Sequence, residues 1–214
     1  MDIYSDAEQH NEQSLQTYGT ALEDARVIII LLHGRGATSK EILFLADLID
    51  IHDVTYLAPQ APGKSWYPNK FTATLASNEP WLSSALGRIN SLLDHIISLG
   101  IPPEKVVLGG FSQGACLVGE YAVRNPQRYG GIFILSGGLI GPPGTQWKGN
   151  ASLNDTPIFI GCSDRDEHIP LERVYETAEV LARMGGKVET KIFPNLAHTV
   201  HPDEINAIRK MLTA

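Results

Sequence analysis

A short motif around Ser112 could supply a nucleophile. Residues 110–114 read Gly-Phe-Ser-Gln-Gly, a G-x-S-x-G pattern that directly follows the apolar run 106–108 and precedes the helix-like run 115–123. In a strand-to-helix turn of this kind, small glycines let the neighbouring backbone pass close by, and the serine hydroxyl is exposed at the tip. The motif therefore predicts a nucleophilic serine, against the alternative that the serine only caps the following helix.

Two further segments could activate that serine, because a serine hydroxyl needs a base within hydrogen-bond reach. Histidine can take and return a proton near neutrality, and a buried carboxylate can orient it. The segment 162–168 offers Asp164 and Asp166, and the segment 194–198 ends in His198. The residues alone leave two alternatives open. Asp164 is either the acid or a turn residue, and His201 is either a second candidate base or a residue at a helix start.

Apolar and amphipathic runs alternate along the chain. Strands that are apolar at consecutive positions are typical of a parallel sheet buried on both faces. The predicted strands are 26–32, 54–58, 105–109, 131–136, 157–161 and 188–193, with an antiparallel edge strand at 13–19. The predicted helices are 39–50, 81–99, 113–125, 171–185 and 202–213. This alternation predicts a three-layer α/β sandwich, with helices on both faces of a mostly parallel central sheet.

The candidate residues follow predicted strands, so we expect them to meet at the carboxyl edge of the sheet. Serine, aspartate and histidine come in the chain order that is found in α/β-hydrolases. Such a site also needs donors for an oxyanion, and the backbone N–H groups of Gln113 and Arg35 are the predicted ones. The Arg35 side chain either has no further role or projects into the cleft to meet a polar acyl end.

Two predicted loops, 59–80 and 137–155, would lie over this edge. They are too short for a large cap domain. Their apolar side chains either line an acyl pocket or pin the loops to the body of the protein. The candidate substrate-binding residues are Trp66, Tyr67, Phe71, Leu139 and Ile140.

The composition indicates a single globular domain over residues 1–214, with residues 1–12 loosely ordered. The net charge of −7 disfavours a nucleic-acid-binding surface and attraction to anionic membranes. Cys116 and Cys162 fall in apolar runs without metal-ligand spacing, so we expect neither a metal nor a cofactor. We find no leader pattern and no apolar stretch of membrane-spanning length, so we expect a cytoplasmic protein without stable membrane association. Apolar loop residues would allow a homodimer.

The chain resembles the phospholipase/carboxylesterase family of α/β-hydrolases, which includes acyl-protein thioesterases and bacterial short-chain carboxylesterases. The resembling segments run from about Arg26 to the C-terminus: LLHGRG at 31–36, AP at 58–59, SWY at 65–67, GGFSQG at 109–114, DRDEHIP at 164–170 and AH at 197–198. The resemblance implies that the acid is the second aspartate of its pair, which gives Ser112, Asp166 and His198 as a triad. His-Gly-Arg-Gly stands where eukaryotic thioesterases have His-Gly-Leu-Gly, which favours a bacterial-type carboxylesterase.

The motifs and the resemblance together imply a serine hydrolase that cleaves a small-molecule carboxylic ester, or a thioester, through an acyl-enzyme on Ser112. One alternative is a lysophospholipase or acyl-protein thioesterase that acts on long acyl chains. Another is a dienelactone-hydrolase-like enzyme, although its nucleophile would normally be a cysteine. A third is a non-catalytic ligand-binding α/β-hydrolase, which would usually have lost a triad member.

Overall fold

The computed structural model describes residues 15–147 and 152–213. The predicted loose segment 1–12 lies outside them. Within the described residues, seven strands form one sheet, with the order β1-β3-β2-β4-β5-β6-β7. Their bounds are β1 (Leu15–Gly19), β2 (Val27–Leu32), β3 (Val54–Pro59), β4 (Val106–Phe111), β5 (Gly131–Leu135), β6 (Pro157–Ser163) and β7 (Lys187–Phe193). The edge strand β1 pairs antiparallel with β3, and the other neighbours pair parallel, as the sequence predicts.

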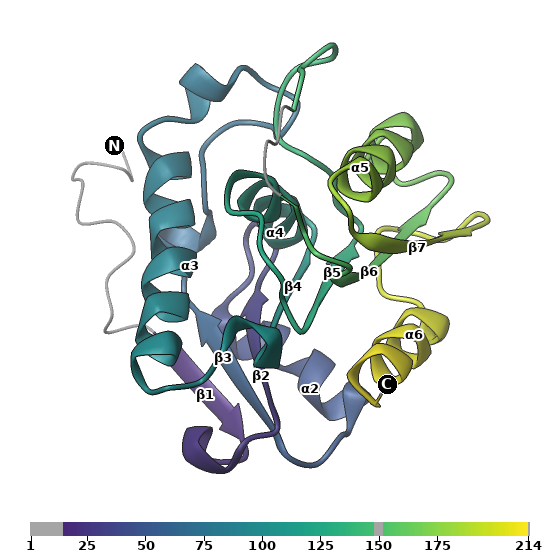
Figure 1. The fold of residues 1–214 in the computed structure, drawn as a ribbon. Coiled ribbons are helices and arrows are strands. Elements are labelled where there is room, and N and C mark those ends of the chain that lie inside the picture. The colour runs from purple at the N-terminus through teal and green to yellow at the C-terminus, as the bar shows by residue number, and fades with distance from the viewer. Residues whose placement is uncertain (1–14, 148–151, 214) are drawn as a thin grey trace.

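Helices cover both faces of this sheet (Figure 1). The helices are α1 (Ser39–Ile42), α2 (Phe44–Ile49), α3 (Trp81–Ser98), α4 (Gln113–Arg124), α5 (Leu171–Arg183) and α6 (Pro202–Thr213). Short 3-10 turns are η2 (Leu22–Asp24), η3 (Pro62–Lys64), η4 (Leu75–Asn78) and η5 (Pro103–Lys105). Apolar residues of α3, α4 and α5 pack on one face, and those of α1, α2 and α6 pack on the other. The prediction of a three-layer α/β fold is confirmed.

One of the predicted helices is not continuous in the structure. The segment 39–50 is split into α1 and α2 at Leu43, whose ψ of −9° departs from the helical value. The segment holds no glycine or proline that would mark this break in the sequence.

The central strands are buried on both faces, which explains their continuous apolar runs. In β2, Ile28, Ile30 and Leu32 belong to one hydrophobic cluster, and Ile29 and Leu31 belong to the other. The strands β4, β5, β6 and β7 are parallel neighbours, so their carboxyl ends lie along a single edge. Among the described residues, no helix is long and apolar enough to cross a bilayer.

Candidate active site

The turn between β4 and α4 holds Ser112 in a strained conformation, with φ of 56° and ψ of −121°. Glycine is required on both sides of it. A Cβ at Gly110 would lie 2.6 Å from the backbone of Gly114, and a Cβ at Gly114 would collide with the carbonyl of Leu32. The Ser112 side chain makes no capping hydrogen bond to α4. Its hydroxyl is therefore directed elsewhere, and the alternative of a helix-capping serine is wrong.

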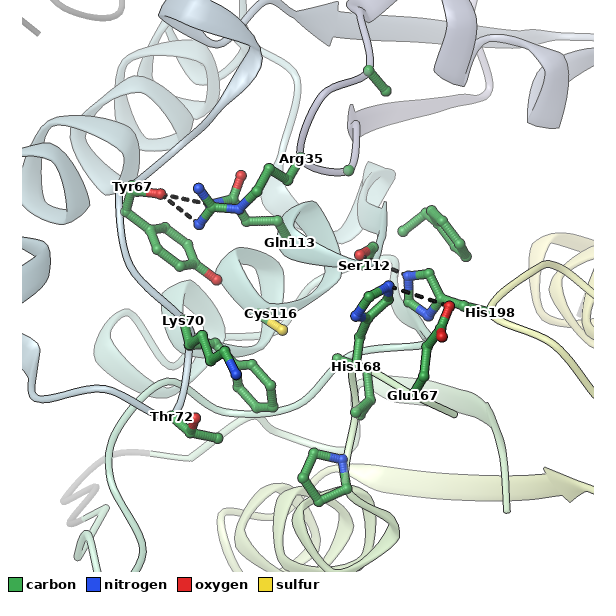
Figure 2. Close-up of a pocket in the computed structure, with 16 residues that line it drawn as sticks. Arg35, Tyr67, Lys70, Thr72, Ser112, Gln113, Cys116, Glu167, His168 and His198 are labelled. Carbon is green, nitrogen blue, oxygen red and sulfur yellow. Dashed lines mark hydrogen bonds and ion pairs between the residues drawn. The ribbon is translucent and has the colours of Figure 1, made fainter. Parts of the chain in front are cut away.

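The Ser112 hydroxyl lies 2.8 Å from Nε2 of His198 (Figure 2), and Nδ1 of His198 lies 2.7 Å from Oδ2 of Asp166. Because the carboxylate can only accept, Nδ1 carries the imidazole proton and Nε2 accepts from the serine. These three side chains come from the carboxyl ends of β4, β6 and β7. The fold thus brings together three residues that are separated by up to 86 positions in the chain.

The Asp166 side chain is completely covered from solvent, while that of His198 is 13% exposed. Burial alone would raise the pKa of Asp166. Hydrogen bonds from His198 and from the backbone N–H groups of His168 and Ile169 outweigh it and lower that pKa to about 2. The carboxylate therefore stays ionised at any pH at which His198 could act as a base.

Asp164 and His201, the alternative acid and base that the sequence left open, have other roles in the structure. Asp164 accepts the backbone N–H of Asn195 at 2.7 Å and so anchors the loop that carries His198. His201 lies at the start of α6, where its N–H donates to Glu204 at 2.7 Å and its ring stacks on Phe193. Neither residue takes part in the hydrogen-bonded chain from Ser112 to Asp166.

The two predicted oxyanion donors lie beside Ser112. The loop after β2 passes against the nucleophile, since a Cβ at Gly34 would be 3.2 Å from Cβ of Ser112. Gln113 is the first residue of α4, so its N–H has no partner within the helix. Among the described residues, the N–H groups of Arg35 and Gln113 donate to no protein acceptor. Both groups are free to bind an oxyanion.

The side chains of the same two residues hold the loop that follows η3. The Arg35 guanidinium donates to the carbonyls of Tyr67, Pro68 and Asn69 at 2.8, 2.9 and 2.7 Å. The Gln113 amide accepts the N–H of Trp66 at 3.0 Å and donates to the carbonyl of Tyr67 at 2.8 Å (Figure 2). The Arg35 guanidinium thus anchors backbone, which neither of its two predicted roles included.

A cavity of about 530 Å³ opens beside Ser112. Of the predicted substrate-binding residues, Tyr67 and Phe71 line it. Trp66, Leu139 and Ile140 do not, and each is fully buried. The Trp66 indole donates to the carbonyl of His33 at 2.8 Å. Leu139 and Ile140 belong to the hydrophobic core, and their N–H groups donate to Thr177 of α5 at 3.0 Å and to Glu120 of α4 at 3.2 Å. The prediction that these three residues bind substrate therefore needs correction, because they pin the loops to the body of the protein.

Several lining residues were missed by the sequence reasoning. They are Gly34, Ala37, Lys70, Thr72, Phe111, Cys116, Glu167, His168, Ile169 and Pro170. Proximity to the motifs could have identified some of them. Phe111 precedes the nucleophile, Cys116 follows it by one helical turn, and His168 is two residues from Asp166. The His168 ring meets the His198 ring edge-on, with 4.7 Å between their centroids.

Cys116 has no nucleophilic character despite its place in the cavity lining. Its side chain is buried, and burial raises the pKa of the thiol to about 12. A neutral thiol is a poor nucleophile, which weighs against a dienelactone-hydrolase-like role for this cysteine. Among the residues that the structure describes, no group of three potential ligands could hold a metal ion.

Known proteins resemble this chain over most of its length. A model of the phospholipase/carboxylesterase family matches residues 20–214. Acyl-protein thioesterase 1 of Saccharomyces cerevisiae is 28% identical over 218 residues, covering 89% of this chain and 93% of that protein. The crystal structure of a phospholipase/carboxylesterase from Dyadobacter fermentans superposes with a TM-score of 0.91 at 36% identity, covering 96% of this chain and 98% of that chain.

A more distant structure shares the fold alone. The carboxylesterase of Bacillus cereus is 18% identical, with a TM-score of 0.73, and the superposition covers 99% of this chain and 96% of that one. The family match spans the G-x-S-x-G turn and the segments that carry Asp166 and His198. The chain therefore belongs to the phospholipase/carboxylesterase family of α/β-hydrolases and is an ester or thioester hydrolase.

Proposed function

We propose that the protein is a serine carboxylesterase that works through an acyl-enzyme on Ser112. The hydrogen-bonded chain from the Ser112 hydroxyl through His198 to Asp166, with lengths of 2.8 and 2.7 Å, carries this proposal. His198 takes the hydroxyl proton as Ser112 attacks the ester carbonyl. The carbonyl oxygen becomes an oxyanion, which the N–H groups of Arg35 and Gln113 bind. Asp166 stabilises the imidazolium that forms.

Collapse of the tetrahedral intermediate breaks the bond to the leaving alcohol or thiol, which receives the proton from His198. Water then enters, gives its proton to the same imidazole and attacks the acyl-enzyme carbonyl. The acid leaves and the Ser112 hydroxyl is regenerated. Each step uses groups of this chain and water, so no cofactor is required.

The cavity supports small or linear acyl groups as substrates. Its volume of about 530 Å³ is within the range of sites for small molecules. Between β5 and β6, the described residues form no helix that could act as a cap. A short-chain carboxylesterase therefore fits better than a lipase that must enclose a bulky triglyceride. The similarity to the yeast thioesterase keeps thioesters and longer chains as the second candidate class.

Hydrolysis of p-nitrophenyl esters from acetyl to palmitoyl tests this function. We expect turnover that is greatest for short acyl chains and that Ser112→Ala abolishes while leaving the protein folded. A preference for long chains would instead favour the lysophospholipase or thioesterase function. Turnover near the wild-type level in Ser112→Ala would refute the mechanism.

A further inference from the structure

The two residues whose N–H groups form the proposed oxyanion hole both send their side chains to one carbonyl, that of Tyr67. The Arg35 guanidinium donates to this oxygen at 2.8 Å, and the Gln113 amide donates to it at 2.8 Å as well (Figure 2). The Ser65 hydroxyl donates to the same oxygen at 2.9 Å. A carbonyl oxygen has two lone pairs, so three donors saturate it. The Tyr67 carbonyl therefore joins the two sides of the oxyanion hole through side chains.

The sheet alone does not hold these two N–H groups at a fixed separation. Pairing between β2 and β4 ends at Leu32 and Gly110. Arg35 and Gln113 each lie three residues beyond those ends. Arg35 also stands between two glycines, and glycine has the most conformational freedom of all residues. The position of the Arg35 N–H therefore depends on contacts that form after the strands have ended.

Such contacts come from the segment 61–69, which we call the brace. On one side of Arg35, the His33 carbonyl accepts the indole N–H of Trp66 at 2.8 Å. On the other side, the Gly36 N–H donates to a carbonyl of η3 at 2.7 Å. The backbone on both sides of Arg35 is thus tied to the same segment that its guanidinium binds.

The Gln113 side chain is tied to the brace from the other side of the oxyanion hole. Gln113 is 6% exposed, and among the described residues its amide hydrogen-bonds only to the brace. The amide oxygen accepts the N–H of Trp66 at 3.0 Å, while the amide nitrogen donates to the Tyr67 carbonyl. Hydrogen bonds shielded from water in this way are stronger than exposed ones. Both ends of the amide are therefore occupied before a substrate arrives.

We propose that the brace sets the separation of the two oxyanion N–H groups, and that the side chains of Arg35 and Gln113 are positioning groups in catalysis. This inference rests on the proposed function, because the two N–H groups matter only if an oxyanion forms. Donors that are already aimed at the oxyanion stabilise it without reorganising as the charge develops. Loosening the brace therefore raises the free energy of the transition state more than that of the bound substrate.

The test measures the inhibition constant of a trifluoromethyl ketone with a short alkyl chain. The Ser112 oxygen bonds to the ketone carbon, the serine proton passes to His198, and the former carbonyl oxygen takes the negative charge. The affinity of this ketone therefore reports on the oxyanion hole. In Arg35→Met we expect the inhibition constant to rise about tenfold or more, and kcat/KM for p-nitrophenyl acetate to fall by a similar factor. A variant that merely folds poorly loses active sites, which lowers the rate but leaves the inhibition constant unchanged.

Arg209→Met is the matched control, because it also removes a positive charge and an arginine that binds backbone. Arg209 of α6 donates to the carbonyls of Leu48 and Ile49 at 2.6 and 2.9 Å and does not line the cavity. Its loss should leave the inhibition constant unchanged, and a rise equal to that in Arg35→Met would overturn the inference. Arg35→Lys keeps the charge without the planar fork, so we expect it to behave like Arg35→Met. A wild-type inhibition constant in either Arg35 variant would also overturn the inference.

Gln113→Met and the double variant with Arg35→Met test the coupling through the Tyr67 carbonyl. Because breaking either side releases the same brace, the double variant should lose little more affinity than the worse of the two single variants. A rise equal to the product of the two single rises would show that the side chains act separately, and would overturn the inference alone. Turnover near the wild-type level in Ser112→Ala would instead overturn the proposed function, so the two failures are distinguishable.

Discussion

The buried carboxyl group of Glu204 should make the stability of the protein depend on pH. Glu204 lies in the first turn of α6 and is 1% exposed. One carboxyl oxygen accepts the N–H of His201 at 2.7 Å, and the other has no partner among the described residues and lies against Gly161. Burial raises the pKa of Glu204 from 4.5 to about 7, against the opposing effect of the hydrogen bond from His201.

The sign and the size of the effect follow from this shift. Between pH 4.5 and about 7 the folded protein holds a proton on Glu204 that the unfolded chain releases. The contribution of Glu204 to the free energy of unfolding therefore decreases as the pH rises through this window, and this contribution is constant on either side. A pKa difference of one is worth about 1.4 kcal/mol, so the whole loss is on the order of 3 kcal/mol at pH 8. That is a large part of the stability of an ordinary domain.

Glu204→Gln removes the ionisation but keeps an oxygen acceptor for His201. Urea unfolding of both proteins at pH 5 and pH 8 gives the change in the unfolding free energy for each. Part of the loss has already occurred at pH 5, so we expect the wild type to lose about 2.5 kcal/mol more than Glu204→Gln between these pH values. Glu189→Gln, at an exposed position, controls for the loss of one negative charge. Equal pH dependence of the wild type and Glu204→Gln would refute the reasoning, because the carboxylate would then be solvated in the folded protein.

Three further predictions concern the site. Asp166→Asn should lower kcat about 10,000-fold, since the asparagine amide would donate to Nδ1 of His198 and force the proton onto Nε2; a loss below tenfold would contradict the orienting role. Arg35→Met should release the three carbonyls that the guanidinium binds, and limited proteolysis should then cut within 59–80 sooner than in the wild type; an unchanged cleavage rate would count against this anchor. Cys116 and Cys162 should be inert to Ellman's reagent until the protein unfolds, because burial raises both thiol pKa values to about 12; stoichiometric labelling of the folded protein would argue the opposite.

Features with a local mechanical cause could be predicted from the sequence. The turn at Ser112 needs small neighbours for steric reasons, so Gly110 and Gly114 mark it directly. The buried strands reveal themselves by continuous apolar runs, and their parallel order then places Asp166 and His198 near the serine. The alternation of these strands with amphipathic helices along the chain also predicted the fold class.

Features decided by contacts between distant segments could not be predicted. An aromatic residue in a loop can line a cavity or pin the loop, and only the packing separates Tyr67, which lines the cavity, from the adjacent Trp66, which does not. The guanidinium of Arg35 finds its acceptors more than 30 positions away. The helix break at Leu43 has no glycine or proline to announce it.

Covalent labelling of Ser112 tests the catalytic mechanism most directly. A fluorophosphonate reacts with a serine only when a neighbouring base activates it. The wild type should gain the mass of one phosphonyl group, and peptide mapping should locate it on Ser112. Ser112→Ala should gain none, and His198→Ala should react far more slowly. Labelling at another residue, or labelling of the wild type and His198→Ala at equal rates, would contradict the proposed triad.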